Sequence, residues 1–588
     1  MVAEARAQIS AGGEIAAARR PPLQLGAEHW VFGISLAVLL LLVVPPILML
    51  VRTSVVVGEC AVREGVVSLS SYAGILASPT LLNLVGGTLT FALGSTLVGL
   101  VLGGMLAWCT ERTNAPFKQL VYAATFVSFA VPGILRTIGW IFILGPRTGA
   151  LNQLYRAVFR TDGVLIDAFS MQAMILVEGI IWIPVVFLMM SASFRSMDPA
   201  MEEAAFVNGA GTWQTLRRIT TRLALPALLS VLLLIFVRSV QAFEVPLLLG
   251  VPAKINVLTT EVYLNVQGQL VPDYSHSGAY GVLLLAFLAV CIYLYSRATR
   301  HASRYATITG KGFRPRVTDL GRGRFVAGAV VLAIITLQFL PVAYLVFASF
   351  LPSLGLDQPL WEQVTFNNYA AILRNPQIPL SLQNSLVIGV VSATVVVLTT
   401  AVVAWVMVRS RIRARGMLDQ LSSLPLVIPG VVLGVAILVL YLRAPQVLHT
   451  PPVYGTIWIL VIAYATSYLP YGLRYAHPAM LQIHPELEES GQLSGASWVS
   501  VFRKIVLPLL LPALFAGWVF VFLISLRELA VAALISTPKS PVIATTMLDL
   551  WNNGNVNQVS AFGAVVAALS IAFSMAAYRF SRRWGIHA

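Results

Sequence analysis

The sequence predicts an all-α polytopic membrane protein of about 12 transmembrane helices, arranged as two parallel six-helix repeats. Three observations support this fold class. Of the 588 residues, 58% are hydrophobic and 11% are charged, whereas soluble domains carry about 25% charged residues. Apolar runs of the roughly 20 residues that cross a bilayer recur along the whole chain. The second half of the chain also repeats the order of features found in the first half.

Long apolar runs separated by polar segments define the expected spans. The first run is too long for the core of a signal peptide and has no small-residue cleavage site, so we expect it to be retained. The predicted spans are residues 30–52, 84–109, 119–145, 171–194, 223–250, 277–297, 326–350, 383–408, 418–442, 456–476, 509–535 and 558–579.

Positive charges indicate how these spans are oriented. The net charge is +15, and Lys and Arg concentrate in alternate loops, which is the bias of cytoplasmic loops. This bias places both termini in the cytoplasm. Because the orientation of the spans accounts for the excess of Lys and Arg, we expect no nucleic-acid partner.

The same pattern divides the chain into four parts. Residues 1–29 are expected to be a cytoplasmic N-terminal segment, and residues 30–297 a first six-span domain. Residues 298–324 are a basic cytoplasmic linker that we expect to face membrane lipid. Residues 325–588 form the second six-span domain.

A polar stretch between the fourth and fifth spans recurs between the tenth and eleventh. The first copy reads EEAAFVNGAGTWQTLRRI from Glu202, and the second reads EESGQLSGASWVSVFRKI from Glu488. Acidic residues begin each stretch and basic residues end it, an order that complements the dipole of a helix. A mid-helix glycine costs about 1 kcal/mol against alanine, so each glycine predicts a bend or a close backbone contact. A capped surface helix without a partner is the alternative, but the duplication argues against it.

The spacing of Glu, a small pair, Gly and Ile in these stretches resembles the EAA loop of permease subunits of binding-protein-dependent ABC importers. In that family the loop is a coupling helix that docks in a groove of a cytoplasmic ATPase. The second copy has Ser490-Gly491 in place of paired alanines, and the first has Thr221-Arg222 where Leu-Pro is expected. The ATPase-coupling residues that the resemblance implies are Glu203, Ala204, Ala205, Gly209, Ile219, Glu489, Gly495 and Ile505.

The resemblance extends over most of the chain. RYATITGKGFRPR, YGTIWILVIAYATSYLPYGLRYA and LQIHPELEESGQLSGASW are similar to fused two-domain permeases of the iron(III)-type group. The resemblance implies a type I ABC importer permease fold, with residues 30–297 and 325–588 as first and second permease domains. It also implies a bacterial inner-membrane location, two copies of a cytoplasmic ABC ATPase, and a periplasmic or lipid-anchored solute-binding protein.

No catalytic chemistry is expected in the chain itself. It has no phosphate-binding G-x-x-x-x-G-K-[ST] loop, so ATP and Mg²⁺ belong to the separate ATPase and no cofactor is expected here. The three cysteines, Cys60, Cys109 and Cys291, and the seven histidines show no metal-ligand spacing. Iron(III) is the favoured solute on resemblance alone. Phosphonate, phosphorylated sugar, thiamine and polyamine remain alternatives, and an ion-driven secondary transporter is the rival class.

Ionisable residues inside spans are costly and mark functional or paired positions. Glu178 and Arg238 are predicted at similar depth and within reach of each other. Pro132-Gly133 and Pro429-Gly430 match between the halves and predict either breaks around a pathway or simple packing kinks. A structural ion-pair network is an equal alternative to a solute path. The candidate pathway or gate residues are Arg136, Glu178, Arg238, Gln241, Glu244, Arg527 and Glu528.

Overall fold

The computed structural model describes residues 25–58, 65–198, 200–299, 317–352, 364–449 and 451–583. Nine helices in these residues are long and apolar enough to cross a membrane, or up to 12 if each of three bent helix pairs is counted as one span. The predicted all-α polytopic fold is therefore confirmed. One short β-hairpin, β1 (Val56–Val57) with β2 (Val66–Val67), lies outside this helical pattern.

The first half contains twelve helices between residues 25 and 299. They are α2 (Leu25–Val55), α3 (Ser70–Ala77), α4 (Thr80–Arg112), α5 (Lys118–Ala130), α6 (Gly133–Leu144), α7 (Ala150–Phe159), α8 (Met171–Ser196), α9 (Ala200–Val207), α10 (Thr212–Thr215), α11 (Thr221–Val240), α12 (Leu258–Gln267) and α13 (Tyr274–Thr299). A π-helical turn, Leu216–Thr220, joins α10 to α11 in one continuous helix.

The second half repeats this order. Its helices are α14 (Gly323–Ala348), α15 (Asn367–Arg374), α16 (Gln377–Arg409), α17 (Gly416–Ser423), α18 (Gly430–Leu448), α19 (Ile457–Gln482), α20 (Glu486–Leu493), α21 (Trp498–Val501), α22 (Leu507–Leu526), α23 (Ala532–Ile535), α24 (Ile543–Asn552) and α25 (Val556–Arg583). A π-helical turn, Phe502–Val506, again joins the short helix to the following span.

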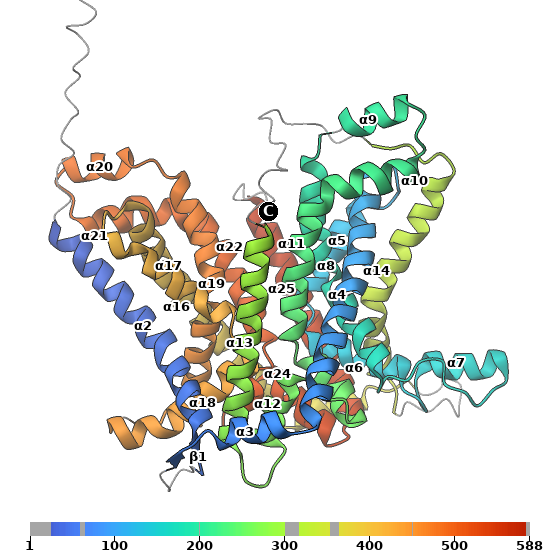
Figure 1. Cartoon of the computed structure of the whole chain (residues 1–588), viewed down its shortest axis with the longest axis horizontal. Helices are drawn as coiled ribbons and strands as arrows, with labels where there is room; N and C mark the ends of the chain where they lie inside the picture. Colours follow the sequence, from blue (N-terminus) through green and yellow to red (C-terminus); the bar gives the residue numbers. More distant parts are fainter. Residues whose placement is uncertain are drawn as a thin grey trace, which may run out of the picture.

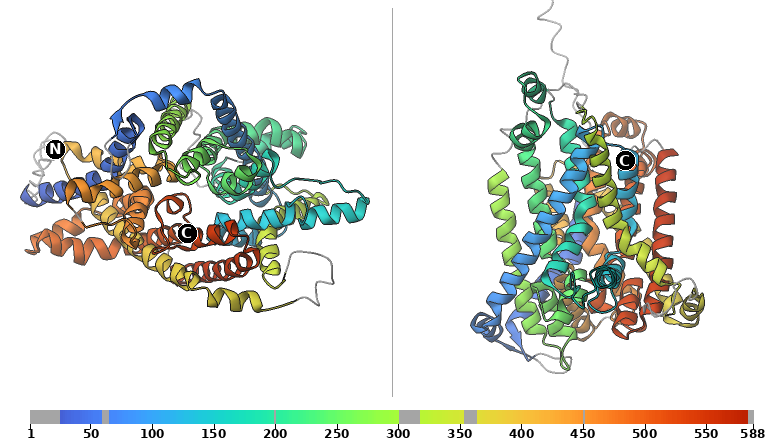
Figure 2. Two further views of the ribbon diagram at one scale, coloured as in Figure 1. Left: turned by 90° about the horizontal axis from the view of Figure 1, so that it is seen from below. Right: turned by 90° about the vertical axis from the view of Figure 1, so that its right-hand side faces the viewer.

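The first helix of each half packs against the other half. Helix α2 contacts α16, α17 and α18, and α14 contacts α4, α5, α6 and α8. Within each half, a long pair forms the centre: α4 packs along α8, and α16 along α19. The two halves are therefore interlocked rather than placed side by side (Figures 1 and 2).

The third and ninth spans are broken where the sequence placed its Pro-Gly pairs. Helices α5 and α6 meet at 103°, and the segment Arg413–Leu426 meets α18 at 104°. Proline lacks an N–H and disfavours a helical residue before it, so the first helical segment ends just before each proline. The predicted breaks are confirmed, and simple packing kinks would be far smaller.

The fifth and eleventh spans end earlier in the chain than predicted. Helix α11 ends at Val240 and α22 at Leu526, so the expected boundaries at 250 and 535 are wrong. In the first half the chain then turns through Pro246–Ala253, which meets α12 at 78°. The apolar residues Pro246–Gly250 are all buried. Composition alone does not distinguish apolar residues that face lipid from those buried in protein.

Candidate functional site

Both repeated polar stretches form surface helices at one end of the bundle. Helices α9 and α20 lie at opposite corners of this end (Figure 1), which we call the α9/α20 end; α3 and α12 lie at the other end. Gly209 and Gly495 follow these helices with φ of +81° and +85°, a conformation that glycine adopts without steric cost. The predicted bend is therefore present. Close backbone contact is absent, since nothing described lies within 4 Å of a Cβ built on either glycine.

A buried acid holds α9 to the end of a long spanning helix. The Glu202 carboxylate accepts a hydrogen bond from Arg112, the last residue of α4, and one of 2.6 Å from the Thr220 hydroxyl. Arg112 also donates to the Phe194 carbonyl near the end of α8, at 3.4 Å. One arginine thus joins α9 to both helices of the central pair.

The second half builds the same arrangement. The Glu488 carboxylate accepts hydrogen bonds from Arg409 Nε at 2.7 Å and Trp405 Nε1 at 2.8 Å. Arg409 is the last residue of α16, and it also donates to the Ile483 carbonyl after α19, at 2.5 Å. We call Arg112–Glu202 and Arg409–Glu488 the anchor pairs.

Sequence reasoning did not select the anchor pairs as site residues. A signal was present, because Arg112 and Arg409 occupy matching positions in the repeat, as do Glu202 and Glu488. The pairing itself depends on packing of residues about 80 to 90 positions apart in the chain.

The coupling residues chosen from sequence lie beside the anchor pairs. Glu203 and Ala204 are exposed on α9, while Glu489 is half-buried on α20. A Cβ on Gly491 would lie 2.8 Å from Ile505 Cδ1. This contact explains why the second copy has glycine where the resemblance leads one to expect alanine, and it places Ile505 under α20.

The end of the linker attaches beside the first anchor pair. Thr318 N donates to the Arg112 carbonyl at 2.9 Å, and Asn114 N donates to the Thr318 carbonyl at 3.2 Å. The Asn114 side chain also donates to Asp319 at 2.5 Å. Among the described residues the two halves therefore differ here, because the linker contacts the first anchor pair and not the second.

Glycine allows close packing at the Pro-Gly break of the third and ninth spans. The carboxylate of Glu244 occupies the position that a Cβ on Gly133 would take. At the matching break, a Cβ on Gly430 would lie 3.0 Å from the Ala530 Cβ and 3.4 Å from Glu528 Oε1. The chain that follows α11 or α22 therefore packs directly on the backbone of each break.

A charged cluster surrounds these breaks. Arg136 is buried and donates to Ser128 Oγ and to the Val131 carbonyl, both at 3.3 Å. Glu528 accepts a hydrogen bond from the Tyr468 hydroxyl at 2.7 Å. Glu244 lies within electrostatic reach of four other predicted pathway residues: Arg136, Glu178, Arg527 and Glu528.

The predicted pairing of Glu178 with Arg238 is wrong. Glu178 accepts from Trp182 Nε1 at 2.8 Å. Arg238 donates to Gln241 Oε1 at 3.2 Å and to the Tyr471 hydroxyl of the other half at 2.7 Å. The two residues were placed at similar depth, but depth along a span does not determine which side of the helix a residue occupies.

Two matched side chains connect the halves at the breaks. Gln241 Nε2 donates to the Val427 carbonyl at 3.2 Å, and Arg527 donates to the Phe129 carbonyl at 2.7 Å. Each acceptor lies at the end of the helical segment that precedes a Pro-Gly break. Carbonyls at a helix C-terminus lack intrahelical donors and carry partial negative charge. We call these two hydrogen bonds the cross-half bridges.

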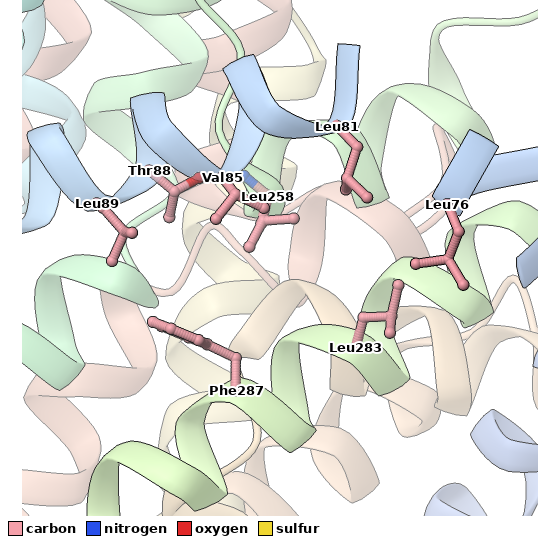
Figure 3. A pocket seen from close by; sticks show the side chains of 8 residues that line it. All are labelled: Leu76, Leu81, Val85, Thr88, Leu89, Leu258, Leu283 and Phe287. Carbon is pink, nitrogen blue, oxygen red and sulfur yellow. Dashed lines mark hydrogen bonds between the residues drawn. The ribbon is translucent and has the colours of Figure 1, made fainter. Parts of the chain in front are cut away.

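An apolar pocket of about 160 Å³ lies away from this cluster, between α3, α4, α12 and α13 (Figure 3). It is lined by Leu76, Leu81, Val85, Thr88, Leu89, Leu258, Leu283 and Phe287. The one polar side chain of this lining, Thr88, donates to the Leu84 carbonyl and accepts from Leu258 N. The pocket offers no group for a charged solute, so the charged cluster is the stronger candidate site.

Metal-ligand geometry is not found in the described part of the chain. No group of three His, Cys, Asp or Glu there could hold a metal ion. Cys109 is buried in α4, Cys291 lies in α13, and Cys60 lies outside the described residues.

Two interlocked helical repeats, each with a broken third span and an anchored surface helix between its fourth and fifth spans, define a transport permease. The chain belongs to the family described as binding-protein-dependent transport system inner membrane component, which matches residues 99–305 and 397–585. It is therefore an ABC importer permease subunit of the inner membrane, with two repeats fused in one chain, and not itself an enzyme. The family resemblance predicted from sequence is confirmed.

Relatives of this chain include permeases of different named systems. A ferric transport system permease protein of Actinobacillus pleuropneumoniae is 25% identical over 93% of this chain and 77% of its own length. An ABC transporter permease protein of Sinorhizobium fredii is 26% identical over 94% of this chain and 95% of its own length. A spermidine/putrescine transport system permease protein of Escherichia coli is 25% identical over 44% of this chain and 95% of its own length.

A solved structure of a bacterial ABC transporter that imports the acidic polysaccharide alginate is also similar. It is 22% identical, covers 41% of this chain and 85% of its own chain, and has a TM-score of 0.34.

Proposed function

We propose that the chain forms the complete membrane pore of an ATP-driven importer that passes a small solute, with iron(III) favoured, to the cytoplasm. The solute arrives from a periplasmic or lipid-anchored binding protein. Both termini and the α9/α20 end face the cytoplasm in this proposal, in line with the distribution of Lys and Arg. Membership of a binding-protein-dependent family supports the proposal.

The observation that carries it is the pair of anchored surface helices. Two copies of a separate ABC ATPase bind α9 and α20 through Glu203, Ala204 and the matching face around Glu489. ATP and Mg²⁺ reside in that ATPase. Because each anchor pair ties its surface helix to the ends of two long spanning helices, displacement of the surface helix moves the central pair of that half.

The cross-half bridges act as the gate in this mechanism. Closure of the ATPase pulls α9 and α20, breaks the hydrogen bonds of Gln241 and Arg527 to the opposite half, and opens the breaks to the solute. Arg238, Gln241 and Arg527 are half-buried, and so are Glu244 and Glu528, so a passing solute can reach all five. The positive charge of Arg238 and Arg527 at the bridges suits an anionic solute, or iron(III) accompanied by an anion, better than a polycation.

Iron(III) is supported by the named function of the A. pleuropneumoniae relative, which spans most of this chain. The polyamine alternative is supported by a relative that matches only one half. A permease need not bind bare metal, because the binding protein holds it and the pore only passes it. Phosphonate, phosphorylated sugar and thiamine remain alternatives, and the experiment below compares them with iron(III).

The deciding experiment measures ATP hydrolysis by the permease with its ATPase in proteoliposomes. The binding protein is added alone or loaded with iron(III), phosphonate, a sugar phosphate, thiamine or spermidine. We expect iron(III) to stimulate hydrolysis and uptake. Stimulation by another solute alone would refute iron(III), and failure of a correctly inserted permease to bind any ATPase would refute the coupling role.

The pathway assignment has its own variants. Arg238→Ala and Arg527→Ala are expected to reduce uptake, whereas the matched control Arg374→Ala, an exposed arginine on α15, is expected to leave it unchanged. Intact uptake by both pathway variants, after correct insertion is verified, would show that these arginines serve only structure.

A further inference from the structure

Helix α7 projects sideways from the bundle, across the direction of the spanning helices. Figure 1 shows it in cyan near the end that holds α3 and α12, and the left view of Figure 2 also shows it extending away from the bundle. It comprises Ala150–Phe159, and it follows α6, the second segment of the broken third span. No role in coupling or in the gate uses this helix.

One face of α7 is fixed by hydrogen bonds. The Asn152 amide donates to the carbonyls of Leu144, Gly145 and Ile166 at 2.9 to 3.0 Å, and its oxygen accepts from Leu165 N at 2.9 Å. One turn later, Arg156 donates to the carbonyls of the preceding loop, Pro146 at 2.8 Å and Arg147 at 2.6 Å. Residues four apart lie on the same face of a helix. The direction of α7 is therefore set by bonds to the end of α6 and to its flanking loops.

The other face of α7 is apolar and uncovered. Leu154 and Val158 are 61% and 64% exposed. Their spacing forms an apolar stripe, and a helix turns by about 100° per residue, which places Leu154 and Val158 away from Asn152 and Arg156. Large exposed apolar surface on a rigid element marks an interaction site.

We propose that α7 lies flat in the interface of the bilayer, with Leu154 and Val158 among lipid acyl chains. Four observations carry this: the family places the bundle in a membrane, α7 lies across the spanning helices near one of their ends, its polar face is occupied, and its apolar stripe is open. Amphipathic helices of this kind bury their apolar face about 5–10 Å into the boundary between head groups and acyl chains. The lipid-facing surface of the bundle thus continues onto α7.

This placement also explains the rigid attachment. Asn152 bonds to the carbonyl of Leu144, the last residue of α6. Helix α6 carries the buried Arg136 and begins at the break. A helix held at the membrane surface therefore fixes the depth of α6 while the other half moves.

The partner that the geometry favours is lipid and not a soluble protein. The loop that bonds to the polar side of α7 contains Asp162 and Asp167, which require water or polar partners. If this loop lies on the aqueous side, the apolar stripe on the opposite side of α7 faces the bilayer.

Spin labels in nanodiscs test this directly with the full chain. In a background with Cys60, Cys109 and Cys291 replaced by alanine, Val158→Cys carries a label on the apolar stripe and Gln153→Cys carries the matched control on another face. Collision with oxygen, which enters the bilayer, is compared with collision with a water-soluble nickel chelate. We expect the label at 158 to favour oxygen and the label at 153 to favour nickel.

Preferential nickel access at 158 would overturn the proposal. If addition of the purified binding protein alone removes nickel access at that position, the stripe is a protein-docking surface and the lipid assignment is wrong. A further label at Leu154→Cys should lose its oxygen preference when Val158→Glu is introduced. Retention of that preference would also contradict the proposal. None of these readouts depends on transport or on an ATPase.

Discussion

At the scale of single residues, the anchor pairs are the feature that connects surface helices to the membrane bundle. Arg409 and Glu488 side chains are 12% and 9% exposed. Removing one partner of a buried ion pair leaves an uncompensated charge, which costs far more than the net contribution of the intact pair. The pairs are thus better described as positional constraints than as sources of stability.

We predict that Arg409→Ala lowers stability by about 3 kcal/mol, because the Glu488 charge stays buried without its partner. Thermal unfolding in detergent measures the change. The double variant Arg409→Ala with Glu488→Ala should lose less than the sum of the two single variants, since contacting residues are not additive. Additive losses would contradict a direct pair, and Arg411→Ala, an exposed neighbour, serves as the control.

The glycine after α9 offers a second residue-level test. Gly209→Ala should cost about 1–2 kcal/mol, because an L-residue in the left-handed region meets its own carbonyl. Gly209→Asn should cost less, as asparagine visits that region more readily. Gly211→Ala is the matched control, because Gly211 has no positive φ and nothing near its Cβ position. Equal effects of Gly209→Ala and Gly211→Ala on the unfolding midpoint would show that the turn is not constrained.

At the scale of elements, the broken spans place helix C-termini where the halves meet. The carbonyls of Phe129 and Val427 are freed by the following breaks, and side chains of the opposite half satisfy them. In straight spans, those carbonyls would accept hydrogen bonds from N–H groups of their own helices. The breaks therefore create the acceptors on which the cross-half bridges depend.

We predict that Arg527→Leu weakens the bridged state by about 1.5–3 kcal/mol, the worth of a hydrogen bond from a charged group. Arg527→Gln should retain a bridge, because Gln241 makes the matching contact in the other half. Leu225 and Leu511 are exposed and occupy matched positions in the two halves. Spin labels at Leu225→Cys and Leu511→Cys report the distribution of distances between α11 and α22. Broadening in Arg527→Leu but not in Arg527→Gln is expected; identical distributions would exclude a bridging role.

At the scale of the whole molecule, each half depends on the other because its first helix, α2 or α14, packs against the opposite half. Helix α2 packs on four helices of the second half, α16, α17, α18 and α19, and α14 packs on four helices of the first. We therefore expect the halves to assemble without covalent fusion. A relative that aligns with 44% of this chain over 95% of its own length is about as long as one half.

We predict that residues 1–306 and 307–588, produced together as two chains, co-purify as one complex in detergent. Removing residues 1–64 from the first chain, and with them α2, should reduce the recovered complex. Independent purification of the two chains would contradict the interlocked arrangement. Recovery unaffected by loss of α2 would show that α14 alone holds the halves together.

Much of the fold and part of the site followed from local sequence. Apolar length gave the spans, and Pro132-Gly133 and Pro429-Gly430 gave the breaks, since these depend on nearby backbone chemistry. The ends of the fifth and eleventh spans were wrong, because apolar residues buried in protein and in lipid have the same composition. Gln241 and Arg527 were chosen for their matched positions, but their acceptors in the opposite half were not foreseen.

By itself the sequence determined the membrane class, the direct repeat, the bends and the family, because each rests on composition or on residues close in the chain. The tertiary structure decided which partner each charged side chain has: Arg112 for Glu202, Arg409 for Glu488, the Tyr471 hydroxyl for Arg238, and the Phe129 carbonyl for Arg527. It also decided that α7 leaves an apolar face uncovered. The physical reason is that partner choice depends on the rotation and relative placement of whole helices, which packing between distant segments sets.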